Sequence, residues 1–286
     1  MNRSIKSRRM QTDCFVLSWL FIFLALSACV LSAAENEETL IPHAPITILT
    51  ASQFTSDFGV VEGSGTPADP YIIRGHEIDA TDASYGIYIE GTTETFRIEG
   101  CTIVGAISTG IKLVDVHDAT IEGCTISSSR LGIGLNNVQH TIVQYNCIQS
   151  CEHIALTLSA SSHNSITGNT MTSGGMGIYL VEKSTNNTIS DNVISCAQPI
   201  FIQSQSGGNS IYRNDFYKGR GKSAAYNRWE NRDGEGNYWQ VYFGADIDQD
   251  GVGDTPFRLL GEAYEYDSHP AMNPFYPDRL LQTEVD

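Results

Sequence analysis

The sequence predicts an all-β protein, a right-handed parallel β-helix of six or more coils, and three observations support that prediction. The first is a repeat of about 23 residues, whose second half begins each time at an aliphatic residue, namely Ile98, Ile121, Val143, Ile166, Ile189 and Ile211. The second is the alternation of apolar and polar residues inside each unit, which is the period of a β-strand. The third is that no helical stretch separates the units. Each unit of such a repeat buries its apolar edge only against its neighbours.

Residues 1–34 have the composition of an export signal. A basic start is followed by an almost continuous apolar run over 14–30 and then by small residues at 32–34. The apolar run is close to membrane-spanning length, and the phrase ending at Cys29 resembles a lipoprotein processing box. An uncleaved anchor and a lipid on Cys29 are therefore alternatives to ordinary cleavage, which we favour because two apolar residues follow Cys29. We expect a protein exported to the periplasm, the cell surface or the medium.

Residues 35–84 are expected to form an N-terminal cap and the first coil, and residues 85–217 the repeats. Inward-facing columns of apolar residues supply the core. They are Ile87, Ile111, Ile133, Leu156, Ile178 and Ile200, their partners two positions later, and the column of Ile103, Ile126, Ile148, Met171, Ile194 and Phe216. Glycine heads the first strand of four coils, where we expect it to permit a tight corner.

A polar column follows three residues after the start of each second half. Its members are Cys101, Cys124, Asn146, Asn169, Asn192 and Asn214. Asparagine in consecutive coils is typical of a turn ladder, because side-chain amides bond to each other and to the backbone. Cys101 and Cys124 lie in adjacent coils and so within disulfide reach, although two stacked thiols fit equally well. The cysteines after residue 34 are odd in number and form no CxxC pair, so neither a zinc site nor a disulfide scaffold is indicated.

Residues 218–286 are expected to form an aromatic-rich C-terminal cap. Between Tyr212 and Tyr276 lie 14 of the chain's 27 aromatic residues. Side chains such as Trp229 and Trp239 can cover the apolar interior and the unpaired strand edges of the last coil. The alternative is that these rings stack on sugars, and we favour the cap.

An acidic loop in this cap predicts a calcium site. Asp246, Asp248 and Asp250 occupy alternate positions, a glycine follows, and Asp254 is the ninth residue, as in the first part of a calcium-binding loop. Such a loop would carry Glu at its twelfth position, where this chain has Phe257, so another acid must complete the shell. We expect Asp246, Asp248, Asp250 and Asp254 to bind a structural calcium ion, with a solvated acidic turn as the alternative.

Three histidines recur at a spacing of 23 residues, namely His117, His140 and His163. All three fall in the turn before the second strand of a coil, so we expect them to line one edge of the molecule. Counted from the strand starts, His140 and His163 share a column and His117 lies one place off. Imidazoles that are one or two coil spacings apart can bind copper or zinc. The alternative is that histidine replaces asparagine in a polar turn ladder, as Asn186 does in the next coil, and no cluster rich in cysteine or methionine accompanies them.

Phrases at both ends of the chain and within the coils resemble NosD-like β-helix proteins. They are Gly63-Ser64-Gly65-Thr66 with Asp69-Pro70-Tyr71-Ile72-Ile73, Ile166-Thr167-Gly168-Asn169, Asn186-Asn187-Thr188-Ile189, and Gly236-Asn237-Tyr238-Trp239 with residues 246–256 and Asp267. The resemblance covers about residues 45–277 and implies an exported β-helix. The family takes its name from a periplasmic accessory protein for copper loading of nitrous oxide reductase, so the resemblance also implies copper handling.

The same coil resembles, more widely, carbohydrate-binding and sugar-cleaving β-helices, and the fold alone does not choose among them. We expect a non-catalytic, exported binding or accessory protein, with a polysaccharide or a cell-surface molecule as partner. The alternatives are an extracellular carbohydrate-binding protein and a polysaccharide lyase or hydrolase. Such an enzyme needs paired carboxylates across a cleft, or calcium together with an arginine as in β-helix lyases. Asp115 and Asp118 flank His117 on one turn, but the loops between coils are short.

The charge of the chain excludes one class of partner. The net charge is −16, and binding to nucleic acid needs a basic face that neutralises phosphates. Contact with a membrane is expected only through an uncleaved or lipidated N-terminus.

Overall fold

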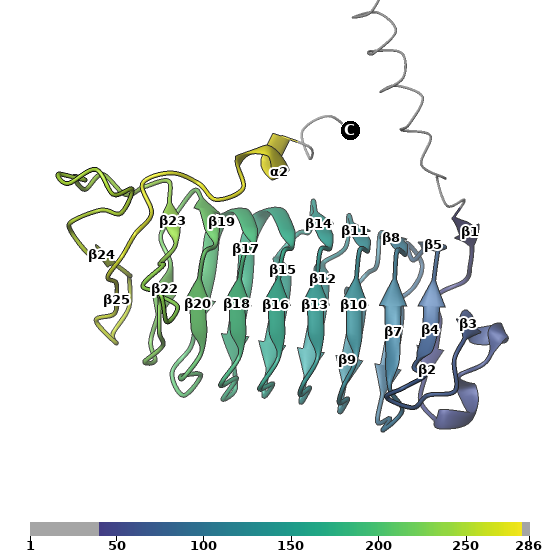
Figure 1. The fold of residues 1–286 in the computed structure, drawn as a ribbon. Coiled ribbons are helices and arrows are strands. Elements are labelled where there is room, and N and C mark those ends of the chain that lie inside the picture. The colour runs from purple at the N-terminus through teal and green to yellow at the C-terminus, as the bar shows by residue number, and fades with distance from the viewer. Residues whose placement is uncertain (1–39, 282–286) are drawn as a thin grey trace, which may run out of the picture. The chain divides into compact units, whose positions relative to one another are not determined.

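The structure, a computed structural model, describes residues 40–281. The expected export signal, residues 1–34 with Cys29, lies outside the described residues. Residues 40–281 form a parallel β-solenoid of about 7 turns with about 23 residues per turn (Figure 1). The predicted parallel β-helix is therefore confirmed. In this described part of the chain, no helix combines the length and the apolar character that crossing a membrane requires.

Each coil of the solenoid contributes strands to three faces. The first face is an 8-stranded sheet. It consists of β4 (Tyr71–Arg74), β7 (Phe96–Glu99), β10 (Thr120–Glu122), β13 (Ile142–Gln144), β16 (Ser165–Thr167), β18 (Thr188–Ser190) and β20 (Ser210–Tyr212), with β3 (Val60–Glu62) antiparallel to β4.

The other two faces join into one 15-stranded sheet, because β17 (Thr170–Val181) and β19 (Val193–Ile202) run through both of them. The second face contains β5 (His76–Asp79), β8 (Thr102–Val104), β11 (Thr125–Ser127) and β14 (Cys147–Gln149), and the third contains β6 (Tyr85–Glu90), β9 (Thr109–Val114), β12 (Leu131–Asn136) and β15 (Ile154–Ser159).

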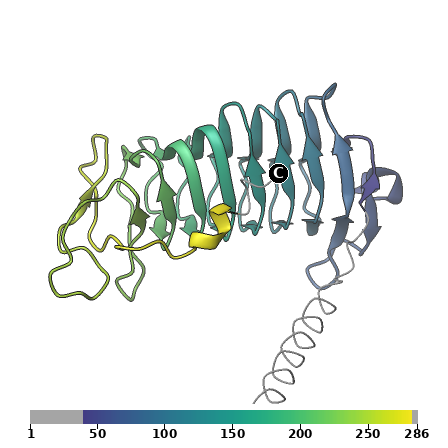
Figure 2. The same ribbon diagram turned by 90° about the horizontal axis from the view of Figure 1, so that it is seen from above.

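Short elements complete both ends of the solenoid. The N-terminal end has β1 (Ile41–Pro42), β2 (Ile46–Ile48) and two 3₁₀ helices, Ala51–Gln53 and Ser56–Phe58; the C-terminal end has β21 (Asp215–Tyr217), β22 (Lys222–Ser223), β23 (Tyr238–Trp239), β24 (Phe257–Arg258), β25 (Tyr266–Asp267) and α2 (Pro277–Leu281). The last segment returns along the coils, so that α2 contacts β19 (Figure 2).

Neighbouring coils stack in register. Ile121 in β10 pairs with Ile98 in β7 and with Val143 in β13, so equivalent residues of successive repeats lie side by side. The predicted inward columns are buried, as Ile111, Ile133 and the other members named above expose 0% of their surface. The apolar surface removed from water in these columns is the main force that holds the coils together.

The glycines that head the strands of the third face serve a different purpose from the predicted one. Gly86, Gly110, Gly132 and Gly177 are absent from the residues with positive φ, so they do not make a corner that only glycine can adopt. A Cβ atom on Gly132 would instead lie 2.4 Å from the carbonyl oxygen of Ala155 and 2.4 Å from Cγ2 of Ile148. Glycine is needed here because the next coil approaches too closely for a side chain.

An asparagine ladder runs along the turn between the first and second faces. In each step Nδ2 of one asparagine donates to Oδ1 of the next, over 2.9–3.0 Å, through Asn146, Asn169, Asn192, Asn214 and Asn237. The last amide, that of Asn237, donates to Oδ2 of Asp267 over 3.1 Å. The ladder predicted at four asparagines is thus confirmed and extends further, to a buried carboxylate.

A second asparagine ladder, which the sequence analysis missed, lies at the turn before the first face. Its amides donate to one another over 2.9–3.0 Å through Asn164, Asn187, Asn209 and Asn227. The backbone N–H of Asn227 then donates to Oε1 of Glu265. Both ladders therefore end on acids from one short segment around β25, and both acids are buried.

Aromatic rings cover the C-terminal end of the core. The ring of Trp239 stacks on Phe216, with centroids 4.2 Å apart, and on Phe257, with centroids 4.6 Å apart. Trp229 and Trp239 are buried, whereas Phe243 is 92% exposed. Phe216 belongs to the last inward column, so these rings continue the core into the non-repeating part of the chain.

Candidate functional site

Two of the three predicted histidines lie together on one edge of the solenoid. His140 and His163 occupy the same turn position in consecutive coils, with φ of 51° and 59°, and Asp118 and Asn186 occupy it in the flanking coils, with φ of 56° each. The centroids of the two imidazole rings are 5.6 Å apart and the rings are inclined by 33°. Both side chains are exposed, so an ion from solvent can reach their nitrogen atoms.

His117 is also exposed but belongs to a different row. It pairs with Gln139, which in turn pairs with Ser162, so His117 lies one position before the row that holds His140 and His163. Within residues 40–281, no three of these imidazoles form a group whose ligand atoms lie within 4.8 Å of one another. Copper binding by His117, His140 and His163 stays a prediction, and the geometry favours His140 and His163 as its centre.

The acidic loop brings together three of the four predicted calcium ligands. Carboxylate oxygens of Asp246, Asp248 and Asp250 lie within 4.8 Å of one another. Asp246 also accepts hydrogen bonds from the backbone N–H groups of Asp250 and Gly251, each over 3.1 Å. The loop is thus curled with its carboxylates facing a common centre, which is the arrangement a hard cation prefers.

The fourth predicted ligand, Asp254, closes the base of the loop. Its Oδ2 accepts a hydrogen bond from the backbone N–H of Ile247 over 2.6 Å. Asp254 is absent from the three-carboxylate group. Calcium binding by Asp246, Asp248, Asp250 and Asp254 stays a prediction.

The ladder position between the first and second faces holds different donors in the first coils. The thiol of Cys101 points to the carbonyl oxygen of Ile73 over 3.8 Å, and the thiol of Cys124 points to that of Ile98 over 3.7 Å. In the next coil the amide of Asn146 donates to the carbonyl of Ile121. Cys101 and Cys124 therefore take the place of ladder asparagines, as the sequence predicted, and they are thiols.

His76 occupies the same position one coil earlier, which the sequence analysis missed. Glu77 pairs with Thr102, so the preceding residues, His76 and Cys101, are equivalent. His76 is 4% exposed, and its ring lies against that of His43, with centroids 4.7 Å apart. The sequence analysis missed this position because the coil that starts at Ile73 is longer than the repeat. Ile73 pairs with Ile98, which lies more than 23 residues further along the chain.

The two thiols influence each other's protonation. The interaction between the two side chains lowers the pKa of the Cys101 thiol and raises that of the buried Cys124 thiol. Burial raises the pKa of the more distant thiols, to about 12 for Cys151 and about 11 for Cys196. Cys101 is therefore the member of the pair whose thiolate is stabilised by its surroundings.

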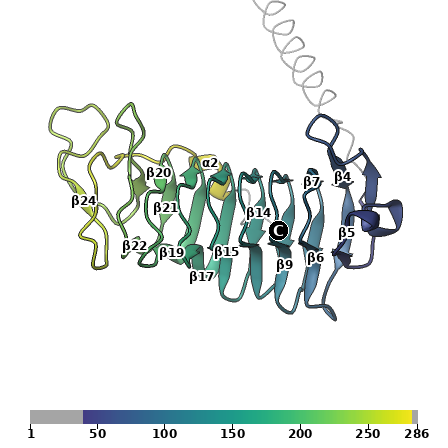
Figure 3. The same cartoon turned by 90° about the horizontal axis from the view of Figure 1, so that it is seen from below.

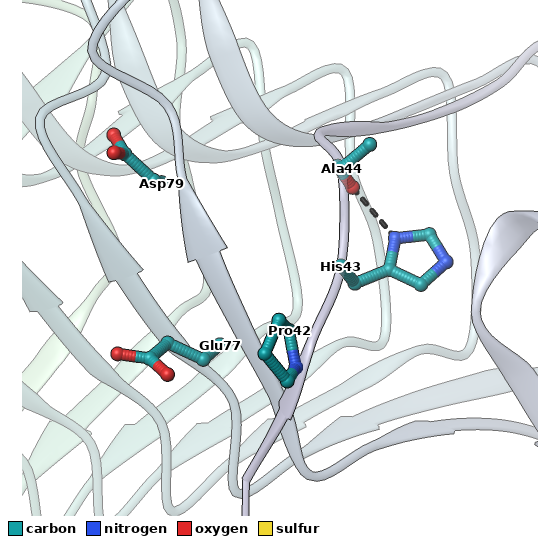
Figure 4. Close-up of a pocket in the computed structure, with 5 residues that line it drawn as sticks. All are labelled: Pro42, His43, Ala44, Glu77 and Asp79. Atoms are coloured by element: carbon teal, nitrogen blue, oxygen red, sulfur yellow. Dashed lines mark hydrogen bonds between the residues drawn. The ribbon is translucent and has the colours of Figure 1, made fainter.

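A pocket of about 340 Å³ lies beside His43, on the outer side of β1 and β5. It is lined by Pro42, His43, Ala44, Glu77 and Asp79. Figure 4 shows the carboxylates of Glu77 and Asp79 on one side of the β1 strand and the ring of His43 directed away from them. The pocket is an acidic depression that can attract cations to the N-terminal end of the solenoid.

The third face carries an outward column with aromatic rings near both ends. The registered column is Tyr88, Lys112, Gly134, Thr157, Tyr179, Phe201 and Lys222. Tyr179 stacks on Phe201, with centroids 5.3 Å apart, and Nζ of Lys222 lies 4.7 Å from the centroid of Phe201. Figure 3 shows β6, β9, β15, β17, β19 and β22 in succession along this part of the solenoid. Flat rings and polar groups in one row are a surface on which sugars can stack.

The two carboxylates considered for an enzyme lie on an exposed turn. Asp115 and Asp118 both have positive φ, of 52° and 56°, and Oδ1 of Asp115 accepts a hydrogen bond from Nδ2 of Asn137 in the next coil over 2.6 Å. Asp115 therefore acts as a link between coils in this structure.

The fold defines a parallel β-solenoid protein. Its turns carry exposed imidazole and carboxylate groups and, inside the coils, buried thiols. A family model described as "Periplasmic copper-binding protein (NosD)" matches residues 60–244. The chain therefore belongs to the NosD family. The resemblance to NosD-like β-helix proteins is thus confirmed for the family and the fold.

Comparison with other known proteins adds little to this assignment. No curated protein matches the chain significantly. A solved structure, described as "Crystal structure of Dettilon tailspike protein (gp208)", is similar over 70% of this chain and 54% of its own, with 12% sequence identity and a TM-score of 0.37. The chain spans about half the length of that protein.

Proposed function

We propose that this protein is an exported accessory protein that binds copper at the edge formed by His140 and His163. Membership of a family described as periplasmic and copper-binding supports both export and copper. The observation that carries the proposal is the adjacency of two exposed imidazoles, with ring centroids 5.6 Å apart, at one turn position of consecutive coils. Imidazole nitrogen is a preferred ligand of copper.

The rigidity of the edge strengthens the argument. The backbone N–H of Asp118 donates to the carbonyl of Gln139, and that of His163 donates to the carbonyl of Thr185. The turns that bear the imidazoles are therefore bonded to the coils on either side, and only side-chain rotation is needed to direct two nitrogens at one ion. His117 in the neighbouring row, and solvent, complete the coordination.

Copper retention after dialysis tests the proposal. Residues 35–286 are exposed to Cu(II), dialysed, and analysed for metal content and by electron paramagnetic resonance for nitrogen coordination. The double variant His140→Asn with His163→Asn should lose the copper and keep the fold, because Asn186 already occupies the equivalent turn position. His153→Asn, another exposed histidine, is the matched control and should retain it. Equal copper in the wild type and the double variant would refute the proposal.

A second candidate function is carbohydrate binding, favoured by the outward column of the third face. Tyr179, Phe201 and Lys222 form a continuous stack there, and aromatic rings offer flat apolar surface to sugar rings. A glycan array probed with the wild type and with Phe201→Ala distinguishes this function from copper binding. Loss of a glycan signal in Phe201→Ala, with copper binding intact, would support it, whereas the absence of any glycan signal would exclude it.

A further inference from the structure

Four exposed basic side chains gather at the C-terminal end of the third face. Lys218, Arg220 and Lys222 occupy alternate positions of one segment. Arg258 lies beside that segment, because its carbonyl oxygen accepts a hydrogen bond from Nη2 of Arg220 and because Lys222 forms a bridge with Leu260. Figure 1 shows β22, β24 and β25 together at this end of the solenoid. We call Lys218, Arg220, Lys222 and Arg258 the basic patch.

The basic patch stands out in an acidic protein. The chain has a net charge of −16, and other arginines, such as Arg97 and Arg213, form ion pairs with carboxylates. Among residues 40–281, no member of the basic patch forms an ion pair, not even with Glu262, the exposed acid between β24 and β25. Four positive charges are therefore left without a partner on this surface, where they attract anions.

Three of the four charges lie over aromatic rings. Cζ of Arg220 is 5.0 Å from the ring centroid of Phe257, and Cζ of Arg258 is 5.3 Å from that of Tyr264. The amine of Lys222 is similarly placed, as described above. A guanidinium group that stacks on a ring is held in orientation while the N–H groups at its edge stay accessible. Those N–H groups form the planar fork that binds a carboxylate through two parallel hydrogen bonds.

The backbone that carries the basic patch is fixed on both sides. The backbone N–H of Lys218 donates to Oε1 of Gln240 over 3.1 Å. The carbonyl oxygen of Arg220 accepts a hydrogen bond from Nε2 of Gln198 over 2.7 Å. The charges are thus displayed by a preorganised segment, and a ligand that binds them loses less free energy to the ordering of the protein.

The basic patch continues the outward column of the third face. Lys222 pairs with Phe201, which in turn pairs with Tyr179, so aromatic rings and positive charges follow one another along the solenoid at steps of about 4.8 Å. Tyr264, which is 68% exposed, borders the patch at its other side. A row of this kind matches a linear ligand in which rings and negative charges repeat.

We propose that the basic patch binds a polysaccharide whose sugar units carry carboxylates. The sugar rings contact the aromatic side chains of the column, and the carboxylates accept paired hydrogen bonds from the guanidinium groups of Arg220 and Arg258. This inference rests on the second candidate function, carbohydrate binding, and gives the ligand a chemical class. It does not depend on copper binding at the histidine edge.

A binding titration with carboxylated polysaccharides tests the proposal. The protein without its expected export signal, residues 35–286, is titrated with alginate, polygalacturonate and hyaluronate. The same three polymers, after reduction of their carboxyl groups to alcohols, are the matched neutral ligands. We expect the wild type to bind at least one carboxylated polymer and not its reduced form. The affinity should fall as salt is added, because ions screen the attraction between exposed charges.

Variants of the basic patch separate a specific site from general electrostatics. The double variant Arg220→Gln with Arg258→Gln removes both planar forks and should bind about tenfold more weakly, or less. Arg130→Gln with Lys183→Gln, at two exposed basic residues outside the patch, changes the net charge equally and should bind as the wild type does. Arg220→Lys with Arg258→Lys keeps the charge without the fork and should restore only part of the affinity. Circular dichroism and a cooperative melt verify that each variant folds.

Several outcomes would overturn the proposal. They are equal binding by the wild type and the glutamine double variant of the patch, an equal loss in the Arg130 and Lys183 variant, and no binding to any of the three carboxylated polymers. Tighter binding to vesicles that contain phosphatidylglycerol, or to single-stranded DNA, would also overturn it and assign the patch to a phosphate ligand.

Failure of this inference is distinguishable from failure of carbohydrate binding itself. Binding that survives carboxyl reduction, or a glycan signal that is lost in Phe201→Ala but unchanged in the glutamine double variant, would leave carbohydrate binding in place and exclude the carboxylated ligand. Loss of copper in the His140 and His163 variants leaves the polysaccharide titration unaffected.

Discussion

Each asparagine within the ladders satisfies several buried groups at once. Oδ1 of Asn192 accepts from the backbone N–H and from Nδ2 of Asn169. Its Nδ2 donates to Oδ1 of Asn214 and to the carbonyl of Ile166. No other side chain of similar size supplies both an acceptor and two donors, which explains why asparagine recurs at these positions.

Substitution of a ladder asparagine should therefore be severe. Asn192→Ala removes the acceptor of the buried backbone N–H of Asn169 and the side-chain donor to the carbonyl of Ile166, and we expect the free energy of unfolding to fall by about 3 kcal/mol or more. Urea denaturation measures the loss. Asn273→Ala, the same change at an exposed position, is the control and should alter stability little. A loss of equal size in both variants would contradict the argument.

Two buried aspartates at the C-terminal end have pKa values above the ordinary value for aspartate. Burial raises the pKa of Asp267 to about 6, against hydrogen bonds from Trp239, Asn237 and His269 that lower it. Burial likewise raises the pKa of Asp215 to about 6, although Asp215 accepts bonds from the backbone N–H groups of Phe275 and Tyr276. Both carboxyls are therefore more readily protonated in the folded protein than in the unfolded chain.

The folded protein should become less stable as the pH rises from the unfolded pKa of aspartate to the folded pKa of these carboxyls. The unfolded pKa of aspartate is 3.8 and the folded pKa of Asp267 is about 6, so between those values the folded state binds more protons. The free energy of unfolding should decrease by roughly 3 kcal/mol across this window for a shift of this size. Urea denaturation between pH 4 and 7 measures it. Asp267→Asn should weaken the dependence and the exposed Asp57→Asn should not. An unchanged slope in Asp267→Asn would contradict the assignment.

At the scale of the element, the strands of the third face depend on close contact between coils. Gly132→Ala would place a Cβ 2.4 Å from two atoms of neighbouring coils, and we expect a loss of about 1–3 kcal/mol from overpacking. Gly174→Ala is the matched control, because a Cβ there meets no atom within 4 Å. Thermal denaturation compares the two. Equal melting temperatures of the Gly132→Ala and Gly174→Ala variants would contradict the prediction, because they would show that neighbouring coils can move apart to admit a methyl group without loss of stability.

The loop of residues 246–254 supports a further prediction. If its three clustered carboxylates hold calcium, the ion offsets their mutual repulsion and stabilises the folded state by mass action. The melting temperature should therefore be higher with calcium than with chelator, and Asp248→Ala should abolish the difference. Asp233→Ala, at an exposed aspartate outside the loop, should retain it. Identical melting of the wild type in both conditions would disprove the calcium site.

At the scale of the whole molecule, each coil should be a removable unit. Val143 and Ile166 are paired equivalents in adjacent coils, so deletion of residues 143–165 removes one repeat and leaves both ladders continuous, with Asn169 next to Cys124 and Asn187 next to Thr141. We expect a folded protein that is less stable in proportion to the lost interface. Deletion of residues 143–154, half a coil, should prevent folding because it exchanges faces. Circular dichroism and urea denaturation distinguish the outcomes.

The sequence was sufficient to predict the architecture, because a repeat places the same residues at the same positions. Ile98, Ile121 and their successors specified the register that the structure has. The second ladder could also have been recognised, because Asn164, Asn187 and Asn209 recur at the repeat spacing.

The parts that escaped prediction are those where the repeat is broken. His76 precedes Cys101 by a coil longer than the repeat, so its equivalence became visible only from the strand pairing. Asp267 belongs to β25, which pairs with β24 in an antiparallel way, and Glu265 directly precedes β25. The repeat gives no guide to this part of the chain. The histidine row, by contrast, was predictable in spacing and in register, because His117 falls one place away from His140 and His163 when counted from the strand starts, and the structure confirms this offset.

The way in which both ladders finish has a consequence for the growth of the solenoid. Every bond from one ladder amide to the next runs in the C-terminal direction, and the series ends on Asp267, whose ionised carboxylate can accept hydrogen bonds but has none to donate. A second molecule placed end to end would therefore find no donor with which to continue the series. Open solenoid ends otherwise offer strand edges that recruit further chains into filaments. Because Glu265 and Asp267 end the two ladders with acceptors, we expect this end of the solenoid to disfavour the addition of a second molecule.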